Sequence, residues 1–270
     1  MVRTILPDAD ECVLEEARVK LLACKKVVAL TGAGISVESG IPDFRSPGGL
    51  WTVMAPEEYA TLDVFLQNPA KAWKLFRAIA EKVAGAEPNP AHEALALLES
   101  KNLLAGMVTQ NVDGLHQAAG SKNVIEIHGD HQHLQCLQCG YLDEVRDRHF
   151  ESDEMPLCPS CEYPLKPNVV LFGEDVRGMD EIRNLLDGCD LLLVVGTSAQ
   201  VYPAAGLPAV VKENNGLVFE FNTQPTALTR GEAMGGFSGM LIPSVLASVG
   251  TDYFFQGKAS ETLTRLVSRL

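Results

Sequence analysis

The sequence predicts an α/β fold in which an open parallel sheet carries helices on both faces. Short apolar runs with the character of buried strands alternate with amphipathic helical segments along most of the chain. Several of these runs end in small or polar residues, and two Cys-x-x-Cys pairs interrupt the alternation. Alternating strands and helices are typical of a parallel sheet. Because ligands of such sheets bind beyond the carboxyl ends of the strands, we expect the functional site there.

Composition sets the size and class of the molecule. The chain has 270 residues, which suggests one large domain or a domain with a smaller module, and 46% of them are hydrophobic, enough for a substantial core. Lys and Arg number 22 against 35 Asp and Glu, so the formal net charge is −13. Proteins that bind nucleic acids usually present a basic face, so we expect no direct nucleic-acid partner.

Targeting features indicate a protein that does not enter a membrane. No run in the sequence approaches the roughly 20 consecutive apolar residues of a membrane-spanning helix. The first residues, MVRTILPDADECVLEEARVK, are rich in acidic side chains, which does not fit a secretory signal or a mitochondrial presequence. We therefore expect a monomer in the cytoplasm or nucleus, with a mitochondrial location left open.

The periodicity of apolar residues predicts the individual elements. Helices are expected over 10–24, 69–83, 89–101, 179–189 and 260–270. Strands or extended segments are expected over 27–30, 103–111, 124–129, 165–174, 190–198 and 216–222. Four of the strand ends read GAG, TQN, GTS and FN, so they can line one crevice. The stretch 231–250 gives weak and mixed signals.

The cysteine pairs predict a metal site. They are Cys136/Cys139 and Cys158/Cys161, separated by eighteen residues. Two such knuckles fit a tetrahedral four-thiolate zinc site, and a redox role would not require two pairs at this distance. Four thiolates close the site, so zinc is expected to stabilise the fold and not to catalyse. His131 and His133 are therefore interpreted as surface or second-shell residues, and Cys12, Cys24 and Cys189 as buried small hydrophobes.

A glycine turn follows the first predicted strand. GAGISVESG begins at Gly32 and departs from the GxGxxG pattern at Val37, so a simple tight turn is an alternative to a phosphate-binding loop. The GTS from Gly196 to Ser198 adds a second small strand end and favours a nucleotide. Asn222 ends a third strand, where it fits a ribose ligand and an ordinary turn residue equally well.

Polar residues that could carry chemistry follow two other strands. TQNVDGLH places Gln110, Asn111 and Asp113 just beyond a strand, where they either form a turn or bind a ligand. His128 ends the run VIEIHG. A lone histidine after an apolar strand is usually structural, but its position at a strand end near these candidates makes it a possible general base. His92 and His116 lie in helix-like sequence and are expected to be structural.

The loop that continues the glycine turn also has two interpretations. Asp43, Phe44 and Arg45 stand in a segment rich in glycine and proline, which suits a loop that closes over a ligand. The alternative is a surface loop with one buried phenylalanine.

Taken together, these motifs resemble the sirtuin family of NAD-dependent protein deacylases. The matching segments are GAGISVESGIPDFRSPGGLW, TQNVDGLH, the histidine–glycine pair at 128–129, the two cysteine pairs, KPNVVLFGE, GTS and EFN. They occur in the order of the family and cover about residues 20 to 265.

The resemblance implies a domain organisation. A Rossmann-like NAD-binding large domain would comprise 1–45, 86–130 and 170–270. Residues 46–85 would form a helical module with the cofactor loop, and 131–169 a small zinc-binding domain. Residues 225–250 are longer than the usual connection in the family, and we assign no function to the excess.

The resemblance also implies the roles of individual residues. His128 would be the catalytic base, assisted by Asn111 and Asp113. NAD would contact Gly32, Ala33, Gly34, Asp43, Phe44, Arg45, Trp51, Gln110, Asn111, Asp113, Gly196, Thr197, Ser198, Asn222, Thr223, Gln224 and Ala259. An acyl-lysine peptide would add as a strand beside Val170, Phe172, Gly173 and Glu174. The acyl oxygen would attack the ribose carbon as nicotinamide leaves, giving free lysine and O-acyl-ADP-ribose.

The acyl group that this chain would remove depends on the helix at 69–83. VVGTSAQVYPAAG and VFEFNT most resemble the desuccinylase branch of the family, which binds the acyl carboxylate with a Tyr-x-x-Arg pair in this helix. Counting from Trp73, the corresponding positions are Phe76 and Ile79. Apolar side chains cannot pair with a buried carboxylate, so we expect neutral acyl groups, acetyl or longer.

Three alternatives to this interpretation stay open. One is NAD-dependent transfer of ADP-ribose to protein, which shares the cofactor. The second is removal of succinyl or malonyl groups. The third is a non-catalytic sensor of NAD or ADP-ribose, although a pure sensor would not need His128.

Overall fold

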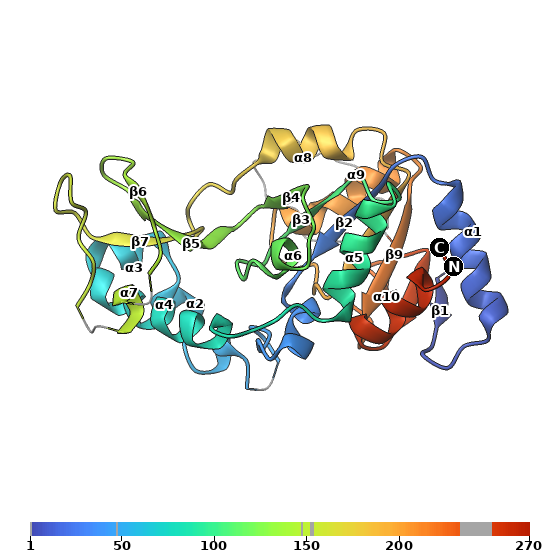
Figure 1. The fold of residues 1–270 in the computed structure, drawn as a ribbon, viewed down its shortest axis with the longest axis horizontal. Coiled ribbons are helices and arrows are strands. Elements are labelled where there is room, and N and C mark those ends of the chain that lie inside the picture. The colour runs from blue at the N-terminus through green and yellow to red at the C-terminus, as the bar shows by residue number, and fades with distance from the viewer. Residues whose placement is uncertain (1, 47, 147, 152–153, 233–249) are drawn as a thin grey trace.

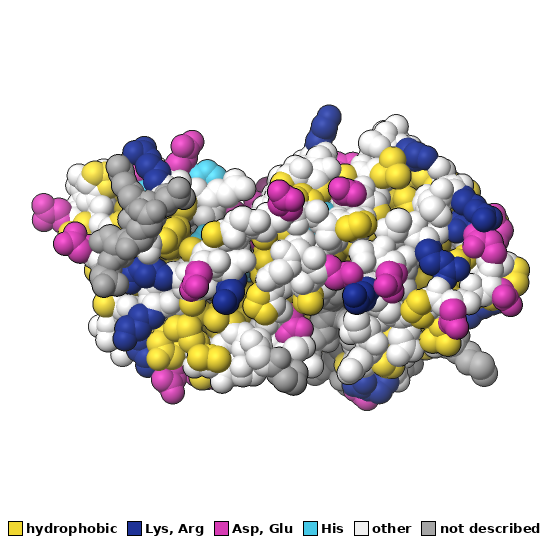
Figure 2. Space-filling view, turned by 60° about the horizontal axis from the view of Figure 1, so that its bottom comes forward, with side chains coloured by type: hydrophobic (Ala, Val, Ile, Leu, Met, Phe, Trp, Pro, Cys, Tyr) yellow, Lys and Arg dark blue, Asp and Glu magenta, His cyan; other side chains and the backbone are white. Residues whose placement is uncertain are grey.

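The computed structural model describes residues 2–46, 48–146, 148–151, 154–232 and 250–270. Two lobes lie along the long axis of the molecule, one around a parallel sheet and one around a small antiparallel sheet (Figure 1). The amino and carboxyl ends of the chain lie side by side on the larger lobe (Figure 1). In the space-filling view the molecule narrows between the two lobes, and on this face acidic and basic side chains are interspersed (Figure 2).

The larger lobe is built on a sheet whose neighbouring strands all pair in parallel. In spatial order the strands are β1 (Arg3–Ile5), β10 (Tyr253–Gln256), β9 (Leu217–Asn222), β8 (Leu191–Val195), β2 (Val27–Thr31), β3 (Gly106–Thr109) and β4 (Val124–Glu126). Every residue of β2, β3 and β8 is buried. Such continuous apolar runs are typical of central parallel strands that are covered on both faces.

Helices cover both faces of this sheet, as the sequence predicts. One face packs against α1 (Glu11–Ala23), α5 (Pro90–Ser100) and α10 (Ala259–Val267). The other face packs against α8 (Met179–Leu186) and α9 (Leu207–Glu213). Short helical turns lie at 33–35, 37–39, 50–52 and 204–206, and α6 (Leu115–Ala118) follows β3.

The smaller lobe combines an antiparallel sheet with short helices. Its strands are β6 (Leu142–Glu144), β5 (Gly129–Cys136) and β7 (Leu165–Val169), in that order. Its helices are α2 (Pro56–Tyr59), α3 (Leu62–Gln67), α4 (Pro69–Val83) and α7 (Arg148–Glu151). Phe65 and Trp73 share one apolar cluster with Leu134 and Leu165, and Trp73 Nε1 donates to the carbonyl of Leu165 at 2.8 Å. The helices and the cysteine-bearing strands therefore form one packed unit, which we call the small module.

Local sequence explains where the main helix of the small module begins. Asn68 accepts a hydrogen bond from the backbone N–H of Lys71 at 3.1 Å, and proline occupies the first helical position. An amide cap and a first-turn proline are favoured at the start of a helix, because the first N–H groups have no partner inside it. The predicted helix over 69–83 is confirmed with these bounds.

The other predicted elements are confirmed with small shifts at their ends, whereas β1, β10 and the strand pairing of the small module are not predicted from the sequence. Cys12 is exposed and not buried as expected, because it points outward from α1. Residues 233–249, which make up most of the stretch 231–250 and of the long 225–250 connection, lie outside the described residues. Among the described residues, no helix is both long and apolar enough to cross a bilayer.

Candidate active site and metal centre

Four neighbouring strands of the large sheet end at one edge. β9, β8, β2 and β3 are adjacent in this order, and Thr31 pairs with both Val195 and Thr109, so three of the ends are level. The residues at and beyond these ends are Asn222, 196–198, 32–34 and 110–111. The structure therefore brings together the strand ends that the sequence places in one crevice.

The turns after β2 and β8 need glycine because their backbones are in direct contact. Gly34 N donates to the carbonyl of Gly196 at 2.8 Å. A Cβ atom on Gly34 would lie 2.7 Å from that oxygen, and one on Gly196, whose φ is +61°, would lie 2.3 Å from the backbone nitrogen of Ile35. A Cβ on Gly32 would lie 2.8 Å from Thr197 Cβ. Any larger residue would push the two turns apart.

Side chains link the same strand ends. Gln110 Nε2 donates to Thr197 Oγ1 at 2.9 Å, and Asn222 Nδ2 donates to the carbonyl of Thr197 at 3.1 Å. Arg45, in the loop that follows the glycine turn, donates from Nη1 to Ser198 Oγ at 3.4 Å. These five residues, all predicted to contact the cofactor, thus form two hydrogen-bonded groups that meet at the adjacent Thr197 and Ser198.

Asn111 and Asp113 are joined by a serine that sequence reasoning did not single out. Ser36 Oγ donates to Asp113 Oδ2 at 2.7 Å and accepts from Asn111 Nδ2 at 3.1 Å. His92 Nδ1 accepts from the N–H of Asn89, so its proton is on Nε2, which faces Ser36 Oγ at 3.5 Å. Burial lowers the pKa of His92, which keeps the ring neutral. The serine hydroxyl is thereby held with its proton toward the carboxylate.

His116 lies behind this group and is buried, as expected of a structural histidine. Its Nε2 is 2.8 Å from Thr31 Oγ1, which donates to Thr109 Oγ1 at 2.8 Å across β2 and β3. The ring packs edge-on against His92 with centroids 4.9 Å apart. Burial lowers the pKa of His116 to about 3, with the neighbouring His92 acting in the same direction. Both rings are therefore uncharged at neutral pH.

His128 lies between the end of β4 and the start of β5, at the junction of the two lobes. Its Nδ1 is 2.9 Å from the carbonyl oxygen of Gln110. Because a carbonyl can only accept, Nδ1 carries the proton and Nε2 keeps its lone pair. Burial lowers the pKa of His128, and the hydrogen bond to Gln110 opposes this shift. The result is a neutral imidazole whose Nε2 can accept a proton.

Gly129 explains why glycine follows this histidine. Its φ is +76°, and a Cβ atom would lie 1.9 Å from the carbonyl oxygen of Asn168. Gly129 pairs with Val169 at the end of β7, and the carbonyl of His128 accepts from Val170 N at 2.7 Å. The glycine therefore lets β7 pass directly beside the backbone of His128.

The loop after the glycine turn is ordered by its own contacts. Asp43 Oδ1 accepts from the backbone N–H groups of Arg45 and Ser46 at 3.0 and 2.7 Å. The Phe44 ring stacks on Trp51 with centroids 5.0 Å apart, and Trp51 N donates to the Phe44 carbonyl at 2.9 Å. Asp43 thus shapes the loop, and its contact with a cofactor stays a prediction.

The predicted adenosine end of the site centres on Asn222. Gly257 N donates to the carbonyl of Asn222 at 3.0 Å. Thr223 N donates to the side-chain oxygen Oδ1 of Asn222 at 2.9 Å. Gln224 is exposed, while Ala259 is buried as the first residue of α10. The structure places the 257–259 turn directly beside the end of β9.

The predicted peptide-binding segment follows β7. Phe172 N donates to the carbonyl of Ala60, and Leu62 N donates to the carbonyl of Phe172, both at 2.9 Å. Phe172 is 45% exposed, and Gly173 is exposed with a φ of +96°. One edge of this segment is therefore occupied by 60–62.

Phe76 and Ile79, predicted to line an acyl pocket, belong to the small module. Phe76 has no exposed surface and meets Trp73 edge-on, with centroids 5.6 Å apart. It shares the apolar cluster with Val169, which precedes the peptide-binding segment, and with Leu171, which lies within it. Ile79 is partly exposed. The structure does not bring either residue to the strand ends, and their role stays a prediction.

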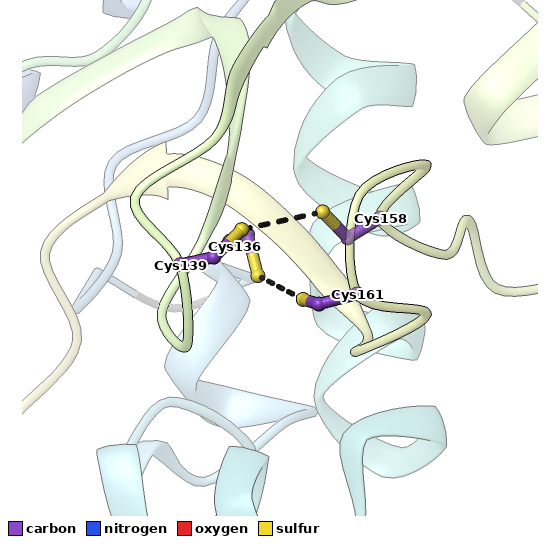
Figure 3. Close-up of side chains that lie close together, drawn as sticks. All are labelled: Cys136, Cys139, Cys158 and Cys161. Atoms are coloured by element: carbon purple, nitrogen blue, oxygen red, sulfur yellow. Dashed lines mark hydrogen bonds between the residues drawn. The ribbon is translucent and has the colours of Figure 1, made fainter.

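The four cysteines of the small module converge (Figure 3). Their sulfurs all lie within 4.8 Å of one another. Cys136 Sγ is 3.5 Å from Cys161 Sγ, and Cys139 Sγ is 3.6 Å from Cys158 Sγ. A tetrahedron with Zn–S bonds of about 2.3 Å has edges of about 3.8 Å, whereas a disulfide is about 2.05 Å long. The cysteines therefore fit a four-thiolate zinc site.

The two histidines near the cysteines differ in environment. His133 is half-buried, with Nδ1 2.7 Å from Asp130 Oδ1. His131 is buried and stacks on Phe150 with centroids 5.1 Å apart, so a surface position is wrong for it. The alternation along β5 puts His131 on the inner face of the strand, the face that also carries Gly129.

Two further residues were missed by the sequence analysis and tie parts of the site together. Ser36 joins Asn111 to Asp113, and Glu38 accepts from Ser260 N and Oγ at 3.1 and 2.6 Å. Ser36 lies between the 3₁₀ turns at 33–35 and 37–39, and Glu38 lies in the second of them. Their short spacing from Gly34 is a signal that could have drawn attention to them.

Comparisons with known proteins agree with this geometry. Residues 32–203 match the Sir2 family. The NAD-dependent protein deacylase of Pyrococcus furiosus is 41% identical over 258 residues, which cover 93% of this chain and 96% of that protein. A crystal structure of a Sir2 homolog–NAD complex matches with a TM-score of 0.82 and 38% identity, covering 100% of this chain and 95% of that one.

A third comparison concerns a complex with a peptide. The structure described as Sir2–p53 peptide–NAD+ matches with a TM-score of 0.79 and 32% identity over 95% of this chain and 98% of that chain. The family match itself takes in the glycine turn, the 109–116 segment, His128 and the four cysteines. On the strength of these matches, the chain belongs to the Sir2 family, the sirtuin family that its motifs indicate.

Proposed function

We propose that this member of the Sir2 family removes acyl groups from lysine side chains of proteins in a reaction that consumes NAD. The observation that carries the proposal is the state of His128. The carbonyl of Gln110 fixes its Nδ1 proton, which leaves Nε2 as a base near the end of β3. Two relatives that are 41% and 40% identical to this chain are named NAD-dependent protein deacylase.

The residues at the strand ends suit a dinucleotide. In the turn at 32–34, the N–H groups of Gly32 and Gly34 are already bonded to the carbonyls of Val195 and Gly196. The turn therefore suits a dinucleotide because its glycines let the ligand approach the backbone closely. Gln110, Asn222 and Ser198 add amide and hydroxyl groups of the kind that bind ribose. Bound NAD would supply the ribose carbon that receives the acyl group as nicotinamide leaves.

The side chains of this protein have distinct tasks in the proposed reaction. His128 Nε2 accepts the proton of a ribose hydroxyl and becomes an imidazolium, which its contact with the Gln110 carbonyl stabilises. Asn111 and Asp113, both held by Ser36, orient the ribose and the nicotinamide amide. The stacked Phe44 and Trp51 form the apolar part of the loop that excludes water.

The peptide adds along one edge of the 170–174 segment. The backbone groups of Phe172 are already bonded to Ala60 and Leu62, so an incoming strand pairs with the opposite edge. Because Val170 N is bonded to the carbonyl of His128, the acyl-lysine arrives next to the base. A p53 peptide is present in one related structure, which supports a peptide substrate here.

A neutral acyl group fits the small module best. Phe76, Val169 and Leu171 present apolar surface to one another next to the peptide segment. Two cations that border this cluster are engaged: Lys166 with Glu174, and Arg77 with the Trp73 ring at 5.5 Å. An acidic acyl group would therefore enter without a partner for its charge.

A panel of acyl-lysine peptides incubated with NAD and read by mass spectrometry tests the proposal. Acetyl and myristoyl peptides are expected to lose their acyl group faster than a succinyl peptide, with O-acyl-ADP-ribose as a product. A heavier, ADP-ribosylated protein would instead establish the transferase alternative. Absence of any turnover with bound NAD would establish the sensor alternative.

The acyl preference is expected to shift toward succinyl groups when a Tyr-x-x-Arg pair is introduced into α4. Phe76→Tyr combined with Ile79→Arg should raise the ratio of desuccinylation to deacetylation at least tenfold, because the new side chains provide a charge-assisted partner for the carboxylate. The matched control is Phe76→Tyr with Val83→Arg, which places the same charge one turn further along α4. Equal ratios in the two double variants would contradict the assignment of this pocket.

A further inference from the structure

Lys166 is a buried cation that the proposed chemistry does not use. It lies in β7, and its side chain has 0% exposure. Its Nζ is 3.0 Å from Glu174 Oε2, and the Glu174 side chain is 14% exposed. The carbonyl oxygens of Pro167 and Val169 also accept from this ammonium group. Burial lowers the pKa of Lys166, and the pairing with Glu174 opposes that shift.

A second group of contacts joins this ammonium to the neighbouring strand. With its amide oxygen facing the cations, Gln135 accepts from Lys166 Nζ at 2.9 Å and from Arg177 Nη2 at 3.1 Å. Arg177 N in turn donates to the carbonyl of Ile127, the residue before His128. The Lys166 ammonium therefore has acceptors from β5, from β7 and from the segment beyond β7.

The glutamate closes the bend that carries the peptide-binding residues. Glu174 Oε2 accepts from Leu171 N at 2.7 Å, and Glu174 N donates to the carbonyl of Leu171 at 3.0 Å. The start of the same bend is fixed by Val170 N, which donates to the carbonyl of His128. One ion pair thus connects both ends of 169–174, the stretch in which Phe172 and Gly173 are exposed.

The Lys166–Glu174 ion pair determines the conformation of the 169–174 bend more than it adds to the stability of the fold. A buried ion pair often contributes no more to stability than apolar side chains of the same volume would, whereas removal of one partner leaves an uncompensated charge. An apolar core at this point would not specify which backbone groups of the bend face outward. The Lys166–Glu174 pair does so, because each of its charged groups also binds backbone atoms of the bend.

We propose that Lys166 is a positioning residue for the peptide substrate: through Glu174 it holds 170–174 in the shape that receives an acyl-lysine strand beside His128. The inference rests on the proposed deacylation and adds to it the group that prepares the docking segment. Lys166 touches neither the acyl group nor NAD in this scheme, so its loss affects peptide binding before it affects cofactor binding.

The test compares four forms of the full chain. Lys166→Met removes the charge and keeps much of the volume, and Lys166→Arg keeps the charge. Lys212→Met is the matched control, since it breaks a half-exposed pair with Asp252, 2.8 Å long, beside the large sheet. KM for an acetyl-lysine peptide, KM for NAD, kcat and the thermal midpoint are measured for each form. Amide hydrogen exchange is followed in segments 168–176 and 217–222.

Lys166→Met is expected to raise KM for the peptide at least tenfold, to leave KM for NAD within twofold, and to speed exchange in 168–176 but not in 217–222. Lys166→Arg should keep the peptide KM and the exchange rates in 168–176 close to the wild-type values. Unchanged exchange in 168–176 and an unchanged peptide KM would overturn the inference, as would an equal rise of peptide KM in Lys212→Met.

A second variant covers the case in which Lys166→Met does not fold. Glu174→Gln has the same shape but leaves Lys166 without its countercharge, and it should show the same rise in peptide KM with a smaller effect on exchange. Normal peptide KM in Glu174→Gln would overturn the inference. If the wild-type chain removes no acyl group, the proposed function fails, while the exchange data still decide whether Lys166 orders 168–176.

Discussion

Replacement of His128 by alanine is expected to lower the turnover of an acyl-lysine peptide by ~10²–10⁴-fold, the range that a general base contributes. The variant loses the Nε2 lone pair that the Gln110 carbonyl keeps available. The backbone bond between His128 and Val170 does not involve the side chain, so the fold should persist. Nicotinamide and O-acyl-ADP-ribose are quantified by mass spectrometry, and folding is followed by circular dichroism.

The control for this variant is His133→Ala. His133 stands in the same strand region but is half-buried and pairs with Asp130, away from the strand ends. Its removal should leave turnover within a few-fold of the wild type. Comparable turnover in His128→Ala and the wild type would remove His128 from the reaction.

The same assignment fixes the pH dependence of the wild-type enzyme. His128 acts as a base only when it is neutral, and burial lowers its pKa below the ordinary value of 6.5. The neutral form therefore predominates at pH 6.5 and above, and the midpoint of the fall in kcat/KM on acidification should lie below pH 6.5. An inflection above pH 7 that disappears in His128→Ala would show instead that the pKa is raised.

Removal of zinc is expected to unfold the small module. Structural zinc sites of small domains contribute an apparent ~10–16 kcal/mol, which is as large as the whole stability of a typical domain, about 5–15 kcal/mol. Cys136 and Cys158 are buried in the same apolar cluster as Trp73 and Phe76, so loss of the metal should also loosen α4. Cys158→Ser, or treatment with a chelator, should abolish turnover and speed amide exchange throughout 129–169.

Zinc content is measured together with activity in this experiment, and Cys12→Ser is the matched control. Cys12 is exposed on α1, remote from the four clustered sulfurs, and its replacement should change neither metal content nor turnover. If Cys158→Ser retained one zinc per chain and full activity, the four-thiolate site would be wrong.

Most strands and helices that cover or form the large sheet could be predicted from their apolar pattern. β2 and β8 are almost entirely apolar, β9 is apolar apart from Glu220 and Asn222, and α10 carries a clear apolar face. β1 and β10 are not predicted. Two of the three residues of β1 are exposed, so it lacks an apolar run, and β10 comes shortly after the stretch 231–250, whose signals are mixed. β5 was missed for another reason: GDHQHLQC is largely polar, and its strand character depends on pairing with β7, which lies about thirty residues later.

The site could be located from sequence but its internal contacts could not. A general rule places ligands at the carboxyl ends of parallel strands, so the tips of β2, β3, β8 and β9 could be grouped before their order was known. The tautomer of His128 depends on a carbonyl eighteen residues away, and the link between Ser36 and Asp113 spans 77 positions. Such contacts follow from packing and have no periodic signature.

The interlocked glycine turns change what these residues can be used to infer. Gly34 and Gly196 exclude side chains because two main chains touch, with no bound molecule involved. A descendant that had lost all dinucleotide chemistry would have to keep both glycines in order to fold. Retention of GAG and GTS in a distant sequence therefore reports shared architecture, while loss of Nε2 at the position of His128 is the change that would report loss of catalysis.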